Sequence, residues 1–235
     1  MHTLANVGPS SIPDYAAQPA RVVSVNVATP RIVRVGDTSV LTSIFKSPVE
    51  GRIPVKGHNL AGDRQADLTV HGGPHKAVYL YPAEHYSFWA DQLGGATLPF
   101  GMFGENLTTS GINENTVRIG DRFRIGSVVL QVTQPRMPCY KLAIRFGRAD
   151  MVKRFWLARR PGIYFSVIEE GDLAAGDLIT KVSEGPEPIT VGGVVRLYLG
   201  DDRDPDNLQR ALRAPLHGGW KDELRSRSSE LRTSE

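Results

Sequence analysis

The sequence predicts a mainly β fold with a few peripheral helices and a small C-terminal helical unit. Between residues 21 and 183 the chain consists mostly of short β-prone segments separated by glycine and proline, which is typical of a barrel or a sandwich. Two longer segments in this region instead show helical spacing of their apolar residues. Beyond residue 187, three short helix-like segments follow one another.

Size, charge and cysteine content limit the class of protein. The 235 residues can bury one good core and have room for a small second unit. The net charge of +3 suits small anions as readily as nucleic acid, so charge alone does not identify a partner. A single cysteine cannot form an intrachain disulfide. We find no secretory signal and no run of the roughly 18 apolar residues that span a membrane, so we expect a cytoplasmic protein without a membrane partner.

The chain is expected to become ordered at Arg21. Residues 1–20 contain three prolines and no periodic apolar pattern, which predicts a flexible leader. Valines recur from Val22 to Val27 and predict the first strand. Further strands are expected at Arg52–Lys56, Ala77–Leu80, Thr116–Ile119, Val128–Thr133, Ile163–Ile168 and Leu178–Val182.

Two segments inside the β region are expected to be helical. Pro82–Leu93 begins with a proline that suits a first helical position, and Tyr86 and Trp89 follow at helical spacing. Arg145–Arg159 offers an apolar face and a basic face, and Pro161 with the next glycine would end it.

The C-terminal region predicts a separate helical unit. Gly185–Pro188 is typical of a linker. Because each of the helices after it is too short to be stable alone, they should pack on each other or on the β domain. We therefore predict a β domain over 21–183, a helical unit over 187–226 and a flexible tail over 227–235. The three expected helices are Val191–Leu199, Pro205–Leu212 and Leu216–Ser226.

The strongest chemical signal is Cys139 with the basic residues around it. A thiol becomes a nucleophile or a soft-metal ligand when neighbouring cations lower its pKa, and Arg136 and Lys141 are close in sequence. Pro135 and Pro138 restrict the backbone, which suits a preorganised loop at the end of a strand. The alternative is that Cys139 is a small buried apolar residue, but the flanking charges argue against a dry pocket.

A second group of candidates surrounds Gly72 and Gly73. Their backbone amides can approach an anion closely, and Lys76 adds positive charge. His71 and His75 are four residues apart, but the Gly-Gly-Pro between them disfavours a helical zinc pair. For both histidines the alternative is a structural hydrogen bond.

Asn106 and several basic residues complete the candidates. Asn106 offers a donor and an acceptor, which suits the edge of a heterocycle, and its alternative is a turn before the next strand. Lys46 and Lys56 are each a phosphate ligand or a solvated surface lysine. The basic segment around Lys153 lacks interleaved aromatic residues on an exposed face, so it favours a solvated face over nucleic-acid binding.

These segments, in this order, resemble the MOSC domain, a family named for the C-terminal domain of molybdenum cofactor sulfurases. The resemblance covers roughly residues 21–183 and is closest to the bacterial YiiM-like group. The C-terminal helices are similar to the three-helix unit of that group, although more loosely. The matching motifs are Lys46–Val49, Gly62–Asp67, His71–Pro74, Ala77–Tyr79, Tyr81–Tyr86, Gly104–Leu107, Gly120-Asp121 and Gln134–Lys141.

The resemblance implies a MOSC-type β-barrel that binds the molybdenum cofactor, Mo-molybdopterin. By this resemblance Cys139 gives a thiolate to molybdenum, the soft ligand expected for such a centre. Basic side chains would hold the cofactor phosphate, and an amide would contact the pterin or the metal pocket. We expect the basic group to be Lys46, His71, Lys76, Arg136 and Lys141, and the amide to be Asn106.

The same resemblance implies an oxidoreductase that reduces N-hydroxylated compounds, such as 6-hydroxylaminopurine, to amines. The chain has no nucleotide-binding glycine fingerprint and no cysteine set for an iron–sulfur cluster, so electrons would come from an external flavoprotein. A monomer and a homodimer are both compatible with the sequence.

Three alternatives stay open at this point. The first is a non-catalytic cofactor carrier or a sulfur-transfer protein that uses Cys139. The second is a metal-dependent hydrolase that uses His71 and His75, which metal analysis would reveal. The third is an RNA or DNA binder, whose mark is a steep salt dependence of binding. We do not expect a nucleic acid polymer as the partner.

Overall fold

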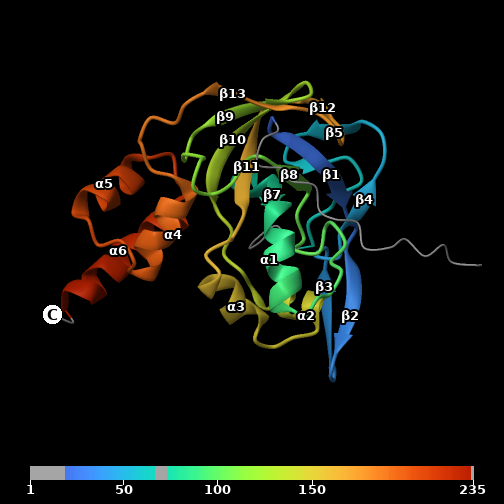
Figure 1. The fold of residues 1–235 in the computed structure, drawn as a ribbon, viewed down its shortest axis with the longest axis horizontal. Helices are drawn as coiled ribbons and strands as arrows, with labels where there is room; N and C mark the ends of the chain where they lie inside the picture. The colour runs from blue at the N-terminus through green and yellow to red at the C-terminus, as the bar shows by residue number, and fades with distance from the viewer. Residues whose placement is uncertain (1–18, 67–72, 234–235) are drawn as a thin grey trace, which may run out of the picture.

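The computed structural model describes residues 19–66 and 73–233 and confirms the mainly β prediction (Figure 1). His71 and nearly all of the expected leader lie outside these residues. The strands are β1 (Arg21–Val27), β2 (Arg31–Val35), β3 (Thr38–Thr42), β4 (Ser47–Val49), β5 (Ile53–Lys56), β6 (Asn59–Leu60), β7 (Val78–Pro82), β8 (Leu107–Ser110), β9 (Arg122–Ile125), β10 (Val128–Pro135), β11 (Ile163–Glu169), β12 (Gly171–Leu173) and β13 (Ile179–Ser183). The helices are the 3-10 turn η1 (Pro74–Lys76), α1 (Glu84–Gln92), α2 (Tyr140–Phe146), α3 (Met151–Leu157), α4 (Val191–Leu199), α5 (Pro205–Arg213) and α6 (Gly218–Thr233).

The largest sheet is strongly curved and has the strand order β13-β9-β10-β11-β7-β8-β1-β4. Its pairs are antiparallel except β7 and β8, which run parallel. The region of β13 approaches β1, because an isolated bridge joins Arg21 to Leu178 and the Val22 N–H donates to the Asp177 carbonyl at 2.9 Å. The sheet is therefore barrel-like, although no continuous ladder joins β1 to β13 in the described part of the chain.

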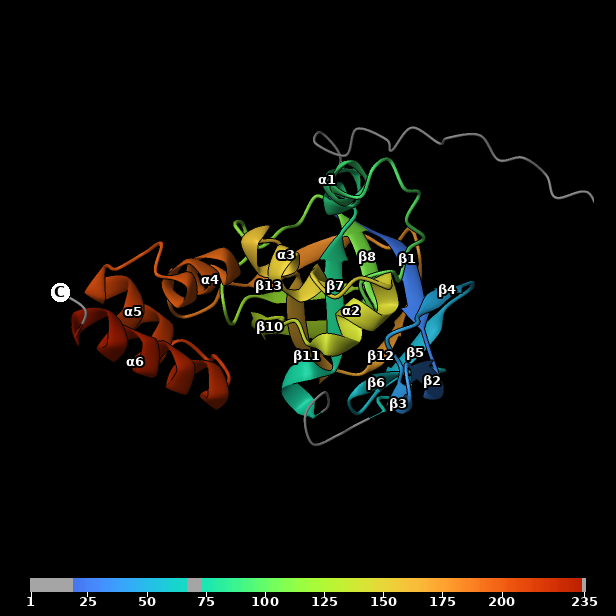
Figure 2. The ribbon, with the colours of Figure 1, turned by 90° about the horizontal axis from the view of Figure 1, so that it is seen from below.

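Two smaller sheets flank this large sheet. One has the order β12-β5-β6, and the other is the β2–β3 hairpin. Figures 1 and 2 show the hairpin on the side of the molecule away from α4, α5 and α6. The hairpin turn uses Gly36 at a φ of 58°, a conformation that glycine adopts without steric cost. The chain leaving this hairpin leads directly to Ser43 and Lys46, which line the cavity described below.

Two of the expected elements are wrong. The single helix expected at Arg145–Arg159 is replaced by α2 and α3, because Gly147 takes a left-handed conformation with a φ of 62° that ends α2. The strand expected at Thr116–Ile119 is a turn with one isolated bridge from Arg118. Here the Arg118 N–H donates to the Asp121 carboxylate at 3.0 Å, so local side-chain bonding replaces a strand ladder.

Packing ties the C-terminal helices to the sheet. One hydrophobic cluster contains strand residues together with Val194 from α4 and Trp220 from α6. The Tyr198 ring lies 5.0 Å from Trp156 of α3 and 5.3 Å from Trp220. The last helix is longer than predicted, because α6 runs past the expected end at Ser226 to Thr233. Within residues 19–66 and 73–233, no helix has both the length and the apolar character that crossing a membrane requires.

Candidate functional site

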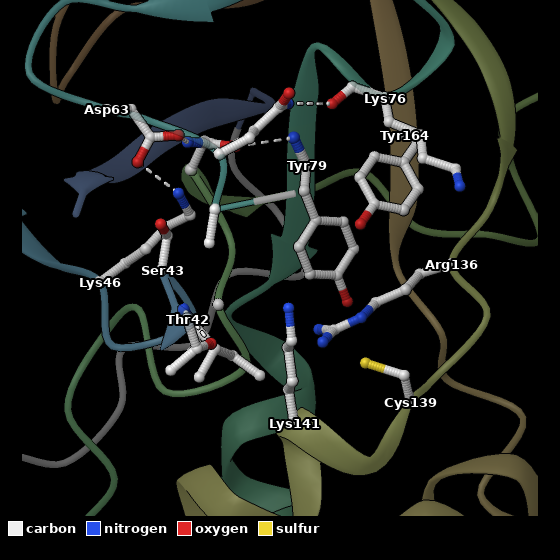
Figure 3. Close-up of a pocket in the computed structure, with 15 residues that line it drawn as sticks. Thr42, Ser43, Lys46, Asp63, Lys76, Tyr79, Arg136, Cys139, Lys141 and Tyr164 are labelled. Carbon is white, nitrogen blue, oxygen red and sulfur yellow. Dashed lines mark hydrogen bonds and ion pairs between the residues drawn. The ribbon is translucent and has the colours of Figure 1, made fainter. Parts of the chain in front are cut away.

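One cavity, of about 90 Å³, brings most of the sequence-predicted site residues together (Figure 3). His71 lies outside the described residues, so its predicted role is untested. The predicted residues that line the cavity are Lys46, Lys76, Asn106, Arg136, Cys139 and Lys141.

Several separate elements place these side chains. Lys46 stands directly before β4 and Asn106 directly before β8, whereas Arg136 directly follows β10. Lys76 belongs to η1, and Lys141 lies in the first turn of α2. The cavity therefore depends on long-range pairing of the sheet, and no single motif forms it.

Cys139 faces this cavity. The residue is half-buried, and its thiol forms no intrachain disulfide. Figure 3 shows its sulfur directed toward the space into which Arg136 and Lys141 also reach. The Leu142 N–H donates to the Cys139 carbonyl at 2.9 Å, so the start of α2 fixes the backbone at the thiol.

Arg136 and Lys141 are buried cations, with exposed fractions of 6% and 8%. Arg136 donates to the Phe103 carbonyl, and its guanidinium carbon lies 4.8 Å from the centre of the Tyr79 ring. Neither cation has a carboxylate at ion-pair distance among the described residues. Buried positive charge without an acidic partner is unfavourable unless an anion joins it. The pair therefore predicts an anionic ligand.

Lys46 differs, because it has an internal partner. Its ammonium pairs with the buried Asp63 carboxylate. Burial lowers the pKa of Lys46 below its ordinary value, although Asp63 opposes this shift. The second Asp63 oxygen accepts from the Asn106 amide at 2.9 Å, and the Asn106 oxygen accepts from the Tyr79 N–H at 3.1 Å. Asn106 thus positions Asp63 and Lys46, and its predicted contact with a cofactor stays a prediction.

Asp63 is a site residue that sequence reasoning did not identify. It appeared there only as part of the motif beginning at Gly62. The signal that could have found it is physical, since a lysine such as Lys46 that becomes buried needs an acidic partner.

Two tyrosines, also not predicted, form an aromatic wall. Tyr164 pairs with Tyr79 across β11 and β7, and their ring centres are 4.9 Å apart. The Tyr79 hydroxyl donates to the Pro161 carbonyl at 2.7 Å. Burial raises the pKa of both tyrosines, so both phenols keep their protons at neutral pH. This wall therefore adds aromatic surface and no negative charge.

A buried carboxylate supports the floor of the cavity. Glu105 accepts hydrogen bonds from the Tyr86 hydroxyl, from the Gly101 N–H at 2.8 Å and from the Thr108 hydroxyl at 2.8 Å. Burial raises the pKa of Glu105. The adjacent Gly104 has a φ of 74°, and a Cβ there would lie 2.8 Å from the Ile44 side chain. This loop, whose Phe103 carbonyl accepts from Arg136, is therefore held in a fixed conformation.

The described part of the structure adds no support for a metal-dependent hydrolase that uses His71 and His75. Among the described residues, no group of three or more His, Cys, Asp or Glu side chains could hold a metal ion. The His75 ring instead contacts the His217 ring, with centres 5.1 Å apart. A hydrolase that uses His71 stays untested, because His71 lies outside the described residues.

Comparison with known proteins points to one family. The MOSC domain model matches residues 67–180. An uncharacterised Bacillus subtilis protein, YflK, is 38% identical, and the match covers 89% of this chain and 95% of YflK. The Escherichia coli protein YiiM is 35% identical, with 79% of this chain and 84% of YiiM covered.

A longer relative and a solved structure extend this comparison. A Gibberella moniliformis protein named "Reductase" is 34% identical over 179 residues, which is 74% of this chain and 32% of that protein. The crystal structure of YiiM from Geobacillus stearothermophilus superposes with a TM-score of 0.73 and 28% identity, covering 89% of this chain and all of that one.

Proposed function

Because this chain belongs to the MOSC domain family, and within it to the YiiM-like group, we propose that it is a molybdenum-dependent reductase of N-hydroxylated compounds. Its substrates would include 6-hydroxylaminopurine and its products would be amines. One observation carries the proposal. The half-buried thiol of Cys139 lines the same cavity as Arg136 and Lys141, two buried cations that have no acidic partner among the described residues.

The residues present fit the molybdenum cofactor, which MOSC domains as a family bind. A thiolate from Cys139 suits a soft metal, and Arg136 and Lys141 supply the charge that the cofactor phosphate requires. When bound, the cofactor would supply two-electron redox chemistry. The protein would orient it and exclude water from it.

Reduction of the substrate consumes two electrons and two protons: R–NH–OH + 2 e⁻ + 2 H⁺ gives R–NH₂ + H₂O. Lys76 is suited to pass the protons, because it lines the cavity, is half-buried and has a pKa that burial lowers. Its Nζ could give up a proton at the cavity and regain one from solvent. Tyr79 and Tyr164 remain protonated and would form neutral walls beside the reacting groups.

The electrons would come from an external flavoprotein. The fungal relative named "Reductase" supports a redox setting for a domain of this kind, and this chain matches only 32% of its length. We propose that the protein works as a terminal reductase with a separate electron-donor partner.

The direct test is turnover of 6-hydroxylaminopurine by protein made in a cofactor-competent host. A flavoprotein reductase with NADH supplies electrons, and adenine is measured by chromatography. We expect steady adenine formation by the wild-type protein and none by Cys139→Ser. A Cys139→Ser protein that keeps full activity with bound molybdenum would contradict the proposal.

The second candidate function is a cofactor carrier or a sulfur-transfer protein. The half-buried thiol of Cys139 favours it, since its thiolate could take the outer sulfur of a donor protein's persulfide and release the donor's thiol, with no reduction of substrate. Molybdenum and pterin on the purified protein, together with no turnover when a reductase is supplied, would support this candidate.

A further inference from the structure

A second cavity, of about 360 Å³, shares part of its lining with the basic cavity. The shared residues are Lys76, Cys139 and Tyr164. The C-terminal segment contributes His217 and Trp220 to the second cavity. Cys139 therefore contributes to two neighbouring cavities, and the C-terminal helical unit helps to form the larger one.

A row of side chains across three strands connects the two cavities. Tyr79 of β7 pairs with Tyr164 of β11, and Tyr164 pairs with Gln134 of β10. Directly paired residues of antiparallel strands lie on the same face of the sheet. Tyr79 lines the basic cavity, Gln134 lines the second cavity and Tyr164 lines both. A register shift lies between Val132 and Gln134 of β10. Such irregularities change the direction of the side chains that follow and are common beside functional sites.

Gln134 carries an unsatisfied polar atom. Its side chain is 2% exposed, and its amide oxygen has no hydrogen-bond partner among the described residues. A buried acceptor of this kind is unfavourable until a donor reaches it. Gln134 lines the second cavity and its amide oxygen is fully covered in this conformation, so a rotation of the side chain would bring that oxygen to a ligand N–H or O–H in the cavity.

The charges of the two cavities differ. Arg136 and Lys141 line only the basic cavity, and Glu223 lines only the second. Burial lowers the pKa of His217, and the nearby His75 and Lys76 lower it further, so His217 is neutral at pH 7. An anionic group therefore favours the basic cavity. The apolar and aromatic lining from Met137, Pro138 and Trp220 suits an uncharged flat ring.

We propose that the second cavity binds an uncharged planar heterocyclic base that carries the N-hydroxylamino group, with the Gln134 amide oxygen accepting a hydrogen bond from it. The choice of substrate class rests on the proposed function. The base would lie against the wall shared with the basic cavity, beside Cys139 and Tyr164. The C-terminal helical unit would then form part of the substrate site.

Binding to the cofactor-free protein tests this inference without any turnover. Calorimetric titration with 6-hydroxylaminopurine should detect one site in the wild-type protein. Gln134→Leu keeps the side-chain size and removes the amide, so the affinity should fall at least about tenfold. The matched control is Gln131→Leu on the same strand, whose amide oxygen accepts from Arg122 at 2.9 Å. The affinity of this control for the base should not change.

A second variant keeps the test usable if Gln134→Leu does not fold. Gly219 is exposed, lies in the first turn of α6 and lines the second cavity. A Cβ there would lie 3.3 Å from the His217 ring, which also lines the cavity, so a leucine would narrow the cavity, and Gly219→Leu should also lose at least about tenfold in base affinity by steric exclusion.

Competition with inorganic phosphate and with neopterin tests which ligand the second cavity binds. Inorganic phosphate should leave the affinity for 6-hydroxylaminopurine unchanged, because it would occupy the basic cavity. Competition by phosphate would overturn the inference. So would tighter binding of neopterin with the same sensitivity to Gln134→Leu, since the cavity would then hold the pterin of the cofactor. Base binding that neither variant affects would also overturn it, while reductase activity in the same protein would leave the proposed function standing.

Discussion

The two cavities that share Cys139 differ in how they are built. In the basic cavity, Lys46 is neutralised inside the protein by Asp63, while Arg136 and Lys141 are buried without an acid among the described residues. In the second cavity the group without a partner among the described residues is an uncharged amide oxygen, that of Gln134. Buried polar or charged groups that have no partner within the protein indicate the chemistry of the ligand that would bind there. By this criterion one cavity is suited to an anion and the other to a neutral hydrogen-bond donor.

The largest effect on stability should come from breaking the internally paired cation. Asp63→Asn removes the charge opposite Lys46 and leaves a buried ammonium unpaired. Loss of one partner from a buried ion pair typically costs about 3–5 kcal/mol. Denaturant unfolding measures this loss. The double variant Lys46→Met with Asp63→Asn should recover part of it, and a double variant as unstable as the single one would show that the pair itself is not the cause.

Removal of Lys141 should have the opposite effect on stability. Lys141→Met removes a buried charge that has no acidic partner among the described residues. Replacing a whole buried ion pair by apolar side chains is often neutral or stabilising by about 1–4 kcal/mol, and a buried charge without a partner is less favourable than a paired one. We therefore expect the cofactor-free protein to become no less stable, while its affinity for inorganic phosphate falls. Unfolding and phosphate titration on the same sample check both parts. A clear destabilisation would mean that Lys141 has a structural role.

A smaller effect on stability, one that depends on pH, is expected at His217 of the second cavity. The folded-state pKa of His217 lies below its ordinary value, so the folded protein binds fewer protons there than the unfolded chain. The contribution of His217 to the free energy of unfolding is therefore lost as pH falls below about 6.5. The melting temperature of the wild-type protein should drop slightly more between pH 7.5 and pH 5 than that of His217→Gln. Identical pH profiles would contradict a lowered pKa.

The smallest effect is expected at a pair far from this chemistry. Arg159 and Asp201 form an exposed, doubly hydrogen-bonded pair, and neither lines either cavity. Exposed ion pairs contribute little to stability because water screens them. Asp201→Asn should leave the melting temperature and both ligand affinities nearly unchanged. A large change in either affinity would mean that ligand binding in the cavities is coupled to the Arg159–Asp201 pair.

Local pattern was enough for some parts of this molecule. The valine run at β1 and the apolar spacing at α1 are strong short-range signals, and both elements form, although Pro82 ends β7 and α1 begins only at Glu84. The break between α2 and α3 was missed because a single glycine, Gly147, reverses the sign of φ inside an otherwise helical pattern.

The site was predicted only in part, for a similar reason. Cys139, Arg136 and Lys141 are neighbours in sequence, so one motif revealed them. Tyr79 and Tyr164 meet only through the register of β7 and β11, which the sequence pattern does not specify. The second cavity was not foreseen at all, because it requires β10 and α6 to come together from distant parts of the chain.

The central claim is that the Cys139 sulfur binds the metal of a cofactor whose phosphate the buried cations hold. Molybdenum X-ray absorption on wild-type and Cys139→Ser protein, both made in a cofactor-competent host, tests it most directly. We expect one more sulfur neighbour to molybdenum in the wild-type protein than in the variant. Identical sulfur coordination in the two proteins, at equal molybdenum content, would contradict it.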